Sequence, residues 1–94
     1  MLFKRKNEMR LTPASHVLST THGDRTILLD VDRGHYYGLD EIGSRIWALT
    51  AQGLAPAAIA RRLADEYDAP LDAIAADVAH FVAGLRRSKL LEET

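Results

Sequence analysis

The apolar positions follow a strand pattern in the first half of the chain and a helical pattern in the second half. Strand-like runs occupy residues 16–21, 26–31 and 35–39. Glycine-containing segments at 22–24 and 32–34 separate these runs and are typical of tight turns between antiparallel strands. The pattern predicts two linked hairpins that form a three-stranded antiparallel meander.

Helical spacing of the apolar positions predicts three helices, over residues 40–53, 56–67 and 72–88. The side chain of Asp40 can cap the free amides of the first helix, and Pro56 stands in the first turn of the second, where its missing N–H costs nothing. Three strands followed by three helices predict an α+β fold. The expected arrangement is winged helix-turn-helix-like, with the helices covering one face of the sheet.

The last of these helices has an amphipathic stripe, most of which must be core. The stripe consists of Ile74, Val78, Phe81, Val82 and Leu85. Small side chains flank it at Ala75, Ala79 and Ala83. They would leave a shallow apolar channel beside a neighbouring strand. Asp72 is expected to cap this helix, and the basic side chains within 86–89 are better explained by the helix dipole than by contact with a ligand.

Length and composition fit a single domain. The chain has 94 residues, of which 47% are hydrophobic and 27% charged, so it can enclose one modest core. Residues 1–9 are mixed and basic, and we expect a flexible arm there, with a short strand near 10–12. Residues 10–94 are expected to form the domain.

Charge and hydropathy bear on the surroundings in which the chain acts. The net charge is −1, and no large basic face of the kind that nucleic-acid binders carry is visible. No apolar run approaches the roughly 20 residues of a membrane span. The start of the chain lacks the apolar segment of a secretory signal. We therefore expect a cytoplasmic protein that binds neither nucleic acid nor membrane.

The sequence offers little catalytic chemistry. Without cysteine, the chain has no disulfide, thiolate metal site or cysteine nucleophile. Its four histidines, at 16, 22, 35 and 80, lack the three- or four-residue spacing that directs two imidazoles at one metal. No set of nucleophile, base and orienting group can be assembled. We expect a chain that is not an enzyme and that uses no metal or cofactor.

The run at 35–39 is expected to be an edge strand, because nothing strand-like lies between it and the helix at Asp40. An open edge can accept an extended peptide as an additional strand. Alternation places Tyr37 and Leu39 on one face together with His35, and Tyr36 on the other.

Three motifs carry a family resemblance: ILLD at 27–30, GHYYGLD at 34–40 and GxxIW at 43–47. Together they resemble the pyrroloquinoline-quinone synthesis protein D family, small peptide chaperones in the biosynthesis of ribosomally made, post-translationally modified peptides. The similarity extends over residues 11–91. Within the family, a free-standing chain of this size looks most like the precursor-recognition protein of lasso-peptide systems.

The resemblance implies that the leader region of a precursor peptide lies antiparallel on strand 35–39 and packs against helix 72–85. In lasso-type relatives the leader contributes a Tyr-x-x-Pro element to an apolar pocket there. The expected leader-peptide-binding residues are Leu29, His35, Tyr36, Tyr37, Gly38, Leu39, Asp72, Ile74, Ala75, Asp77, Val78 and Val82. The pocket wall is expected at Ile74, Ala75, Val78 and Val82. Tyr37 or Leu29 would form its floor, and Asp72 and Asp77 a rim that attracts basic leader residues.

The leading hypothesis is a non-catalytic leader-peptide recognition domain that delivers the precursor to a separate leader peptidase, a cysteine protease. A cyclase is a further candidate partner. One alternative is a winged-helix DNA-binding regulator. The second helix, however, offers only Arg61 and Arg62, followed by the acidic residues of 65–68, which would repel phosphates. A peptide chaperone for a radical enzyme in another modified-peptide pathway is the other alternative.

Overall fold

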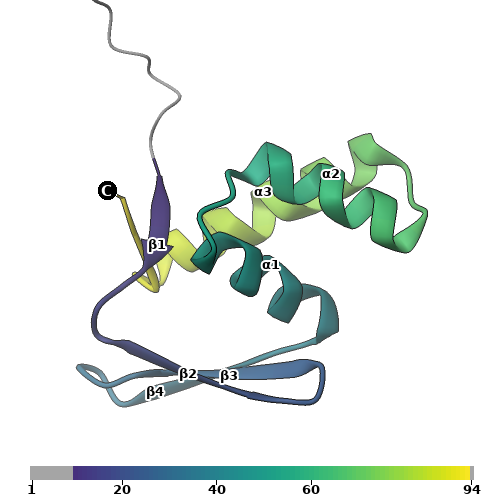
Figure 1. Ribbon diagram of the computed structural model, residues 1–94. Coiled ribbons are helices and arrows are strands. Elements are labelled where there is room, and N and C mark those ends of the chain that lie inside the picture. Colours follow the sequence, from purple (N-terminus) through teal and green to yellow (C-terminus); the bar gives the residue numbers. More distant parts are fainter. Residues whose placement is uncertain (1–9, 94) are drawn as a thin grey trace, which may run out of the picture.

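The computed structural model describes residues 10–93, which form an α+β fold of three helices, a three-stranded antiparallel sheet and a separate two-stranded sheet (Figure 1). The expected basic arm at residues 1–9 lies outside the described residues. The elements in chain order are β1 (Leu11–Pro13), β2 (Val17–His22), β3 (Arg25–Asp30), β4 (His35–Leu39), α1 (Glu41–Ala51), α2 (Pro56–Tyr67), α3 (Leu71–Arg87) and β5 (Leu91–Glu93).

The main sheet has the order β2-β3-β4, and both pairs are antiparallel, as the meander prediction requires. Gly23 and Gly34 lie in the two turns with φ of +63° and +74°, a backbone region that glycine enters without steric cost. In the register, Leu28 faces Tyr37 and Leu29 faces Tyr36. The prediction of the meander is confirmed.

The second sheet joins the two ends of the domain. Strand β1 pairs antiparallel with β5, so that Leu11 lies opposite Glu93 and Pro13 opposite Leu91. The expected short strand near 10–12 therefore exists, displaced by one residue, whereas β5 was not anticipated. Leu90 and Leu91 are buried at this junction and add to the core.

The helix ends show where local signals succeed and where one fails. Asp40 caps α1, since its Oδ1 accepts a hydrogen bond from the Gly43 amide at 2.8 Å. The prediction that Asp72 caps α3 is wrong. Pro70 holds the cap position with an extended backbone and no side-chain bond, so the helix begins at Leu71, one residue before Asp72. A proline preset at φ −62° starts the helix without a polar cap.

All three helices lie on one side of the main sheet (Figure 1). The core between these layers comprises Leu28, Leu39, Ile46, Trp47, Leu49, Ile59, Ala60, Leu63, Val78, Val82, Leu85, Leu90 and Leu91. The opposite face of the sheet is open, with Leu18 58% and Tyr36 72% exposed. Within residues 10–93 no helix has the length and apolar character needed to cross a bilayer.

Candidate functional site

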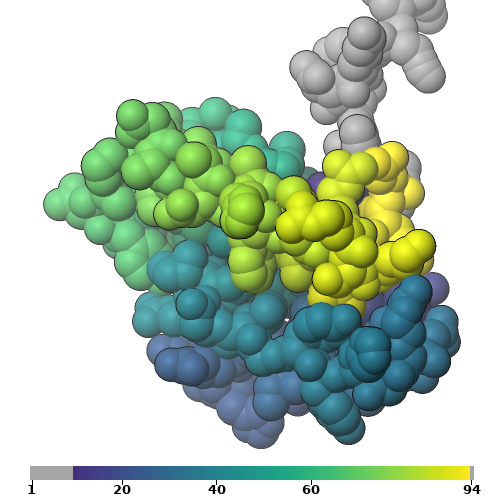
Figure 2. Space-filling model, turned by 180° about the vertical axis from the view of Figure 1, so that it is seen from behind, coloured from purple at the N-terminus to yellow at the C-terminus, as the bar shows by residue number. Residues whose placement is uncertain are grey.

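A cavity of about 350 Å³ lies between strand β4 and the C-terminal half of α3. Its lining residues are Tyr37, Gly38, Leu39, His80, Phe81, Gly84, Leu85, Arg87, Ser88 and Leu90. Figure 2 shows this side of the molecule, where the yellow-green α3 lies above the blue-teal segment that contains β4. The cavity therefore runs alongside the edge of the main sheet.

Strand β4 is an edge strand, because β3 is its only neighbour among the described residues. The Val31 amide bonds to the His16 carbonyl on the β2 side, and the Gly34 amide bonds to the Asp30 carbonyl on the β4 side. Residues of β3 thus bond alternately to β2 and to β4. By this alternation, the backbone groups of Tyr36 and Gly38 point away from β3, towards the open edge.

Two aromatic side chains shape the apolar part of the cavity. Tyr37 is half-buried, and its ring meets the ring of His35 edge-on, with centroids 6.4 Å apart. Phe81 packs against the start of α1, where a Cβ added to Gly43 would lie only 2.9 Å from the Phe81 Cζ. Gly43 is thus required for this close approach, which holds the Phe81 ring beside β4.

A buried carboxylate fixes the turn that leads into β4. Asp30 accepts hydrogen bonds from the backbone amides of Asp32 and Arg33, at 3.0 Å each, and from the Arg33 side chain at 2.9 Å. Burial alone would raise the pKa of Asp30, but these bonds and the charges of His16 and Arg33 outweigh burial and lower it. The ionised carboxylate therefore stabilises the β3–β4 turn.

Comparison with models of known protein families identifies the family to which the chain belongs. The family model described as coenzyme PQQ synthesis protein D (PqqD) matches residues 25–91, which include β4, the cavity and Gly43. The chain belongs to the PqqD family. No sequence among curated proteins matches this PqqD-family chain.

Two solved structures resemble the PqqD-family chain closely. One is TbiB1 in complex with the TbiA(beta) leader peptide, with a TM-score of 0.82 and 33% identity, covering 86% of this chain and 94% of TbiB1. The other is a lasso peptide synthetase B1 complexed with the leader peptide, with a TM-score of 0.79 and 25% identity, covering 90% of this chain and 98% of that protein. Both of these relatives are complexes with leader peptides.

The structure brings together only part of the residue set expected from sequence. Tyr37, Gly38 and Leu39 line the cavity, and His35 and Tyr36 lie beside them on β4. Leu29 does not form the floor, because it pairs with Tyr36 on the open face of the sheet. The buried residues among those that line the cavity are Leu39, Leu85 and Leu90.

On α3 the expected wall is displaced around the helix. Val78 and Val82 are core residues that do not line the cavity, and Ala75 lies on the flank of the helix away from it. Ile74 and Asp77 share the flank of Phe81 and extend it towards the helix start. Asp72 lies still earlier, exposed, in the first turn of α3.

Seven cavity residues on α3 and after it were not among the expected binding residues: His80, Phe81, Gly84, Leu85, Arg87, Ser88 and Leu90. Helical spacing located the apolar stripe of α3. It did not show which flank of that stripe faces β4. The close contact of Phe81 with Gly43 decides that side. Gly43 lies in the GxxIW motif, which was the available signal.

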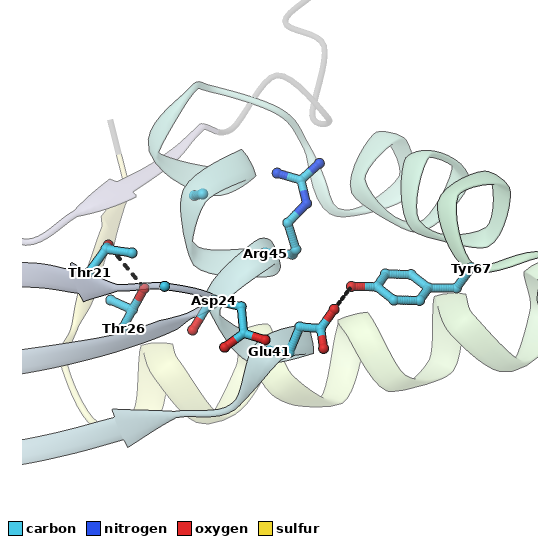
Figure 3. A pocket seen from close by; sticks show the side chains of 9 residues that line it. Thr21, Asp24, Thr26, Glu41, Arg45 and Tyr67 are labelled. Carbon is cyan, nitrogen blue, oxygen red and sulfur yellow. Dashed lines mark hydrogen bonds between the residues drawn. The ribbon is translucent and has the colours of Figure 1, made fainter.

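A second cavity of about 210 Å³ lies between the tip of the β2–β3 hairpin, α1 and the end of α2 (Figure 3). Its polar side chains bond to one another or to close neighbours. The Tyr67 hydroxyl donates to Glu41 at 3.0 Å, which, with burial, raises the pKa of Tyr67. Arg45 pairs with Glu66 at 2.5 Å and lowers the pKa of that carboxyl. These internal bonds account for the charges around this cavity.

Neither cavity has the ligand set of a metal site. Among the described residues, no three His, Asp or Glu side chains come together as a metal ion would require. The cavity beside β4 combines apolar side chains with unpaired backbone groups, which suits an extended peptide better than a small polar substrate.

Proposed function

We propose that this PqqD-family chain is a non-catalytic recognition module that binds the leader region of a lasso-type precursor peptide by strand addition to β4. The proposed delivery target is a separate leader peptidase of the cysteine protease class, with a cyclase as a further candidate partner. Ribosomally made precursors are released in the cytoplasm, and we place the chain there for the same reason.

One observation carries this proposal: the open edge of β4 runs beside an apolar cavity. Backbone groups of Tyr36 and Gly38 supply hydrogen bonds to any extended chain, so they give affinity with little selectivity. Side chains of the guest that enter the cavity between Tyr37 and Phe81 supply the selectivity. The leader complexes of the two similar proteins support this reading.

The proposed contact residues fall into two sets. Residues 35–39 form the strand contact, and the cavity residues of α3 contact the leader side chains. Ile74 and Asp77 extend that surface at the N-terminal end of α3. Val78, Val82 and Ala75 support it from behind, and we propose no direct leader contact for them.

A titration tests the proposal directly. A fluorescein-labelled synthetic leader of the precursor encoded beside this chain, with the TbiA(beta) leader as a second probe, should give saturable fluorescence anisotropy. A scrambled peptide of the same composition is the control. Flat curves for both leaders would refute the proposed function.

A matched pair of variants at one position isolates the strand contact. A Cβ added at Gly38 meets no atom within 4 Å, so Gly38→Ala should fold and bind. Gly38→Pro removes an amide at the open edge while leaving the β3 ladder intact, and proline is tolerated on edge strands. We expect Gly38→Pro to weaken leader binding at least tenfold relative to Gly38→Ala. Equal affinities would contradict strand addition.

A second candidate function follows from the arrangement of the elements, which we infer to be winged helix-turn-helix-like, with the β3–β4 hairpin as the wing. DNA-binding proteins use this architecture. Helix α2 carries Arg61 and Arg62 on its exposed surface, but Asp65, Glu66 and Asp68 follow them. Only a gel shift with steep salt dependence would favour this candidate.

The remaining candidate is a chaperone for a radical enzyme in another modified-peptide pathway. The family match as such is compatible with it, whereas the two similar structures favour the lasso system. Co-purification with the enzyme encoded beside this chain discriminates between the two. Recovery of a radical enzyme in place of a cysteine protease would select this alternative.

A further inference from the structure

The cavity beside β4 has a positively charged end, at the C-terminus of α3. Arg87 lines it and carries the charge, and none of the described lining residues is acidic. We propose that Arg87 selects an acidic side chain of the leader and so determines specificity. This inference rests on the proposed function, because it assigns a subsite within the same groove.

The guanidinium of Arg87 lies over the cavity wall. A Cβ added to Gly84, one turn earlier on α3, would lie 3.7 Å from the Arg87 Nη2. The side chain therefore folds back along the helix over Gly84, which itself lines the cavity. A guanidinium in this position can donate two parallel hydrogen bonds to one carboxylate.

The neighbouring Arg86 has a different role. It donates to the Glu93 carboxylate of β5 and so ties the end of α3 to the second sheet. Within residues 10–93, Arg87 makes no such ion pair. Stabilisation of the helix end by the dipole applies to both arginines alike. It therefore does not explain why only Arg87 lines the cavity.

The direction of the strands locates the acidic residue within the leader. Phe81 contacts Gly43 and therefore lies near the Leu39 end of β4. The chain after α3 reaches the other end of the strand. There the Leu90 carbonyl accepts a hydrogen bond from the Ala14 amide. A peptide antiparallel to β4 therefore runs parallel to α3. Phe81 and Arg87 are six positions apart, a rise of about 9 Å along α3. On an extended strand, the residues that face the same side as a given residue lie about 7 Å and 13 Å away, two and four positions on.

Because alternate residues of an extended strand face the same side, the acidic side chain should thus lie two or four residues towards the leader's C-terminus from the residue that faces Phe81. The experiment replaces each acidic residue of the synthetic leader with lysine, one at a time, and measures affinity for the wild type and for Arg87→Glu. We expect one position at which lysine weakens wild-type binding at least tenfold. Arg87→Glu should restore most of that loss.

Neutral substitutions provide the matched control. Arg87→Gln should weaken binding of the unmodified leader about tenfold, whereas Arg86→Gln, with the same change of charge one residue away, should leave it unchanged. Circular dichroism and the emission of the buried Trp47 verify that each variant is folded.

The outcomes separate the two proposals. If the wild type binds the leader, but Arg87→Gln has no effect and no lysine substitution is rescued by Arg87→Glu, Arg87 only stabilises the helix end and the inference is overturned. A leader without an acidic residue in that stretch overturns it as well. If the wild type binds no leader at all, the proposed function itself fails.

Discussion

The contact between Gly43 and Phe81 gives the sharpest prediction about how the core shapes the groove. In Gly43→Ala, the new methyl carbon would lie 2.9 Å from Cζ and 3.2 Å from Cε1 of Phe81. Because carbon atoms pack best at about 3.5–4.0 Å, the ring must retreat by roughly 0.6 Å or more. The space open to it is the cavity that it lines.

The expected magnitude follows from two opposing effects. Overpacking of this kind costs about 1–3 kcal/mol, and alanine recovers about 1 kcal/mol of helix propensity over glycine. The net loss of stability is therefore about 0–2 kcal/mol, which corresponds to a fall in Tm of up to roughly 15 °C for a domain of this size. Displacement of the ring into the cavity should also weaken leader binding about tenfold, or about 1.4 kcal/mol.

The assay is thermal unfolding followed by Trp47 fluorescence, combined with the anisotropy titration. Phe81→Leu removes the two clashing ring atoms, so in that background Gly43→Ala keeps only its 3.2 Å approach to the Asp40 Oδ1 and should cost less. A double-mutant cycle should then give a coupling of about 1–2 kcal/mol between the positions. Additive effects, or a Gly43→Ala variant with unchanged stability and affinity, would show that Gly43 does not control the position of the Phe81 ring.

Three further predictions concern the core, the β3–β4 turn and the surface. Val78 is 1% exposed, so Val78→Glu buries a charge at a cost of several kcal/mol. This variant should lose the cooperative thermal transition. The control Asp77→Asn, on the exposed flank of the same helix, should leave the transition unchanged. The lowered pKa of Asp30 means that the unfolded state takes up this proton at higher pH than the folded state. The stabilisation is complete at neutral pH and is lost as the pH falls through the acidic range. Asp30→Asn should therefore melt at a lower temperature at pH 7 and show a shallower loss of stability in acid, and an unchanged acid limb would contradict this role. Glu66→Gln removes a partly exposed pair with Arg45 and should change the free energy of unfolding by less than about 1 kcal/mol, as chemical denaturation can measure.

The features predictable from the sequence are those with local causes. Glycine at the two hairpin turns, the Asp40 cap and the first-turn Pro56 act within a few residues, and each appears as expected. Strand β5 could not be found in this way. Its three residues make a strand only by pairing with β1, about eighty residues earlier in the chain.

The residues that line the cavity beside β4 could not be predicted in this way, because they depend on how the helices and strands pack against one another. Leu28 and Leu29 are both apolar, so the two-residue period does not reveal which of them faces the core, and the register decides for Leu28. Helical spacing placed Val78 and Val82 on the apolar stripe of α3. It could not show which residues of the stripe are buried in the core and which line the cavity. That distinction depends on how α3 packs against α1, which the contact between Gly43 and Phe81 controls. Arg87, attributed from the sequence to the helix end, lines the cavity for the same reason.

The proposed function depends on a leader peptide adding a strand to the open edge of β4. Amide hydrogen exchange, followed residue by residue by NMR with and without the leader, tests it most directly. Strand addition predicts that the amides of Tyr36 and Gly38, unprotected in the free protein, become strongly protected on binding, while that of Tyr37 changes little. Leader binding with unchanged exchange at Tyr36 and Gly38 would contradict it.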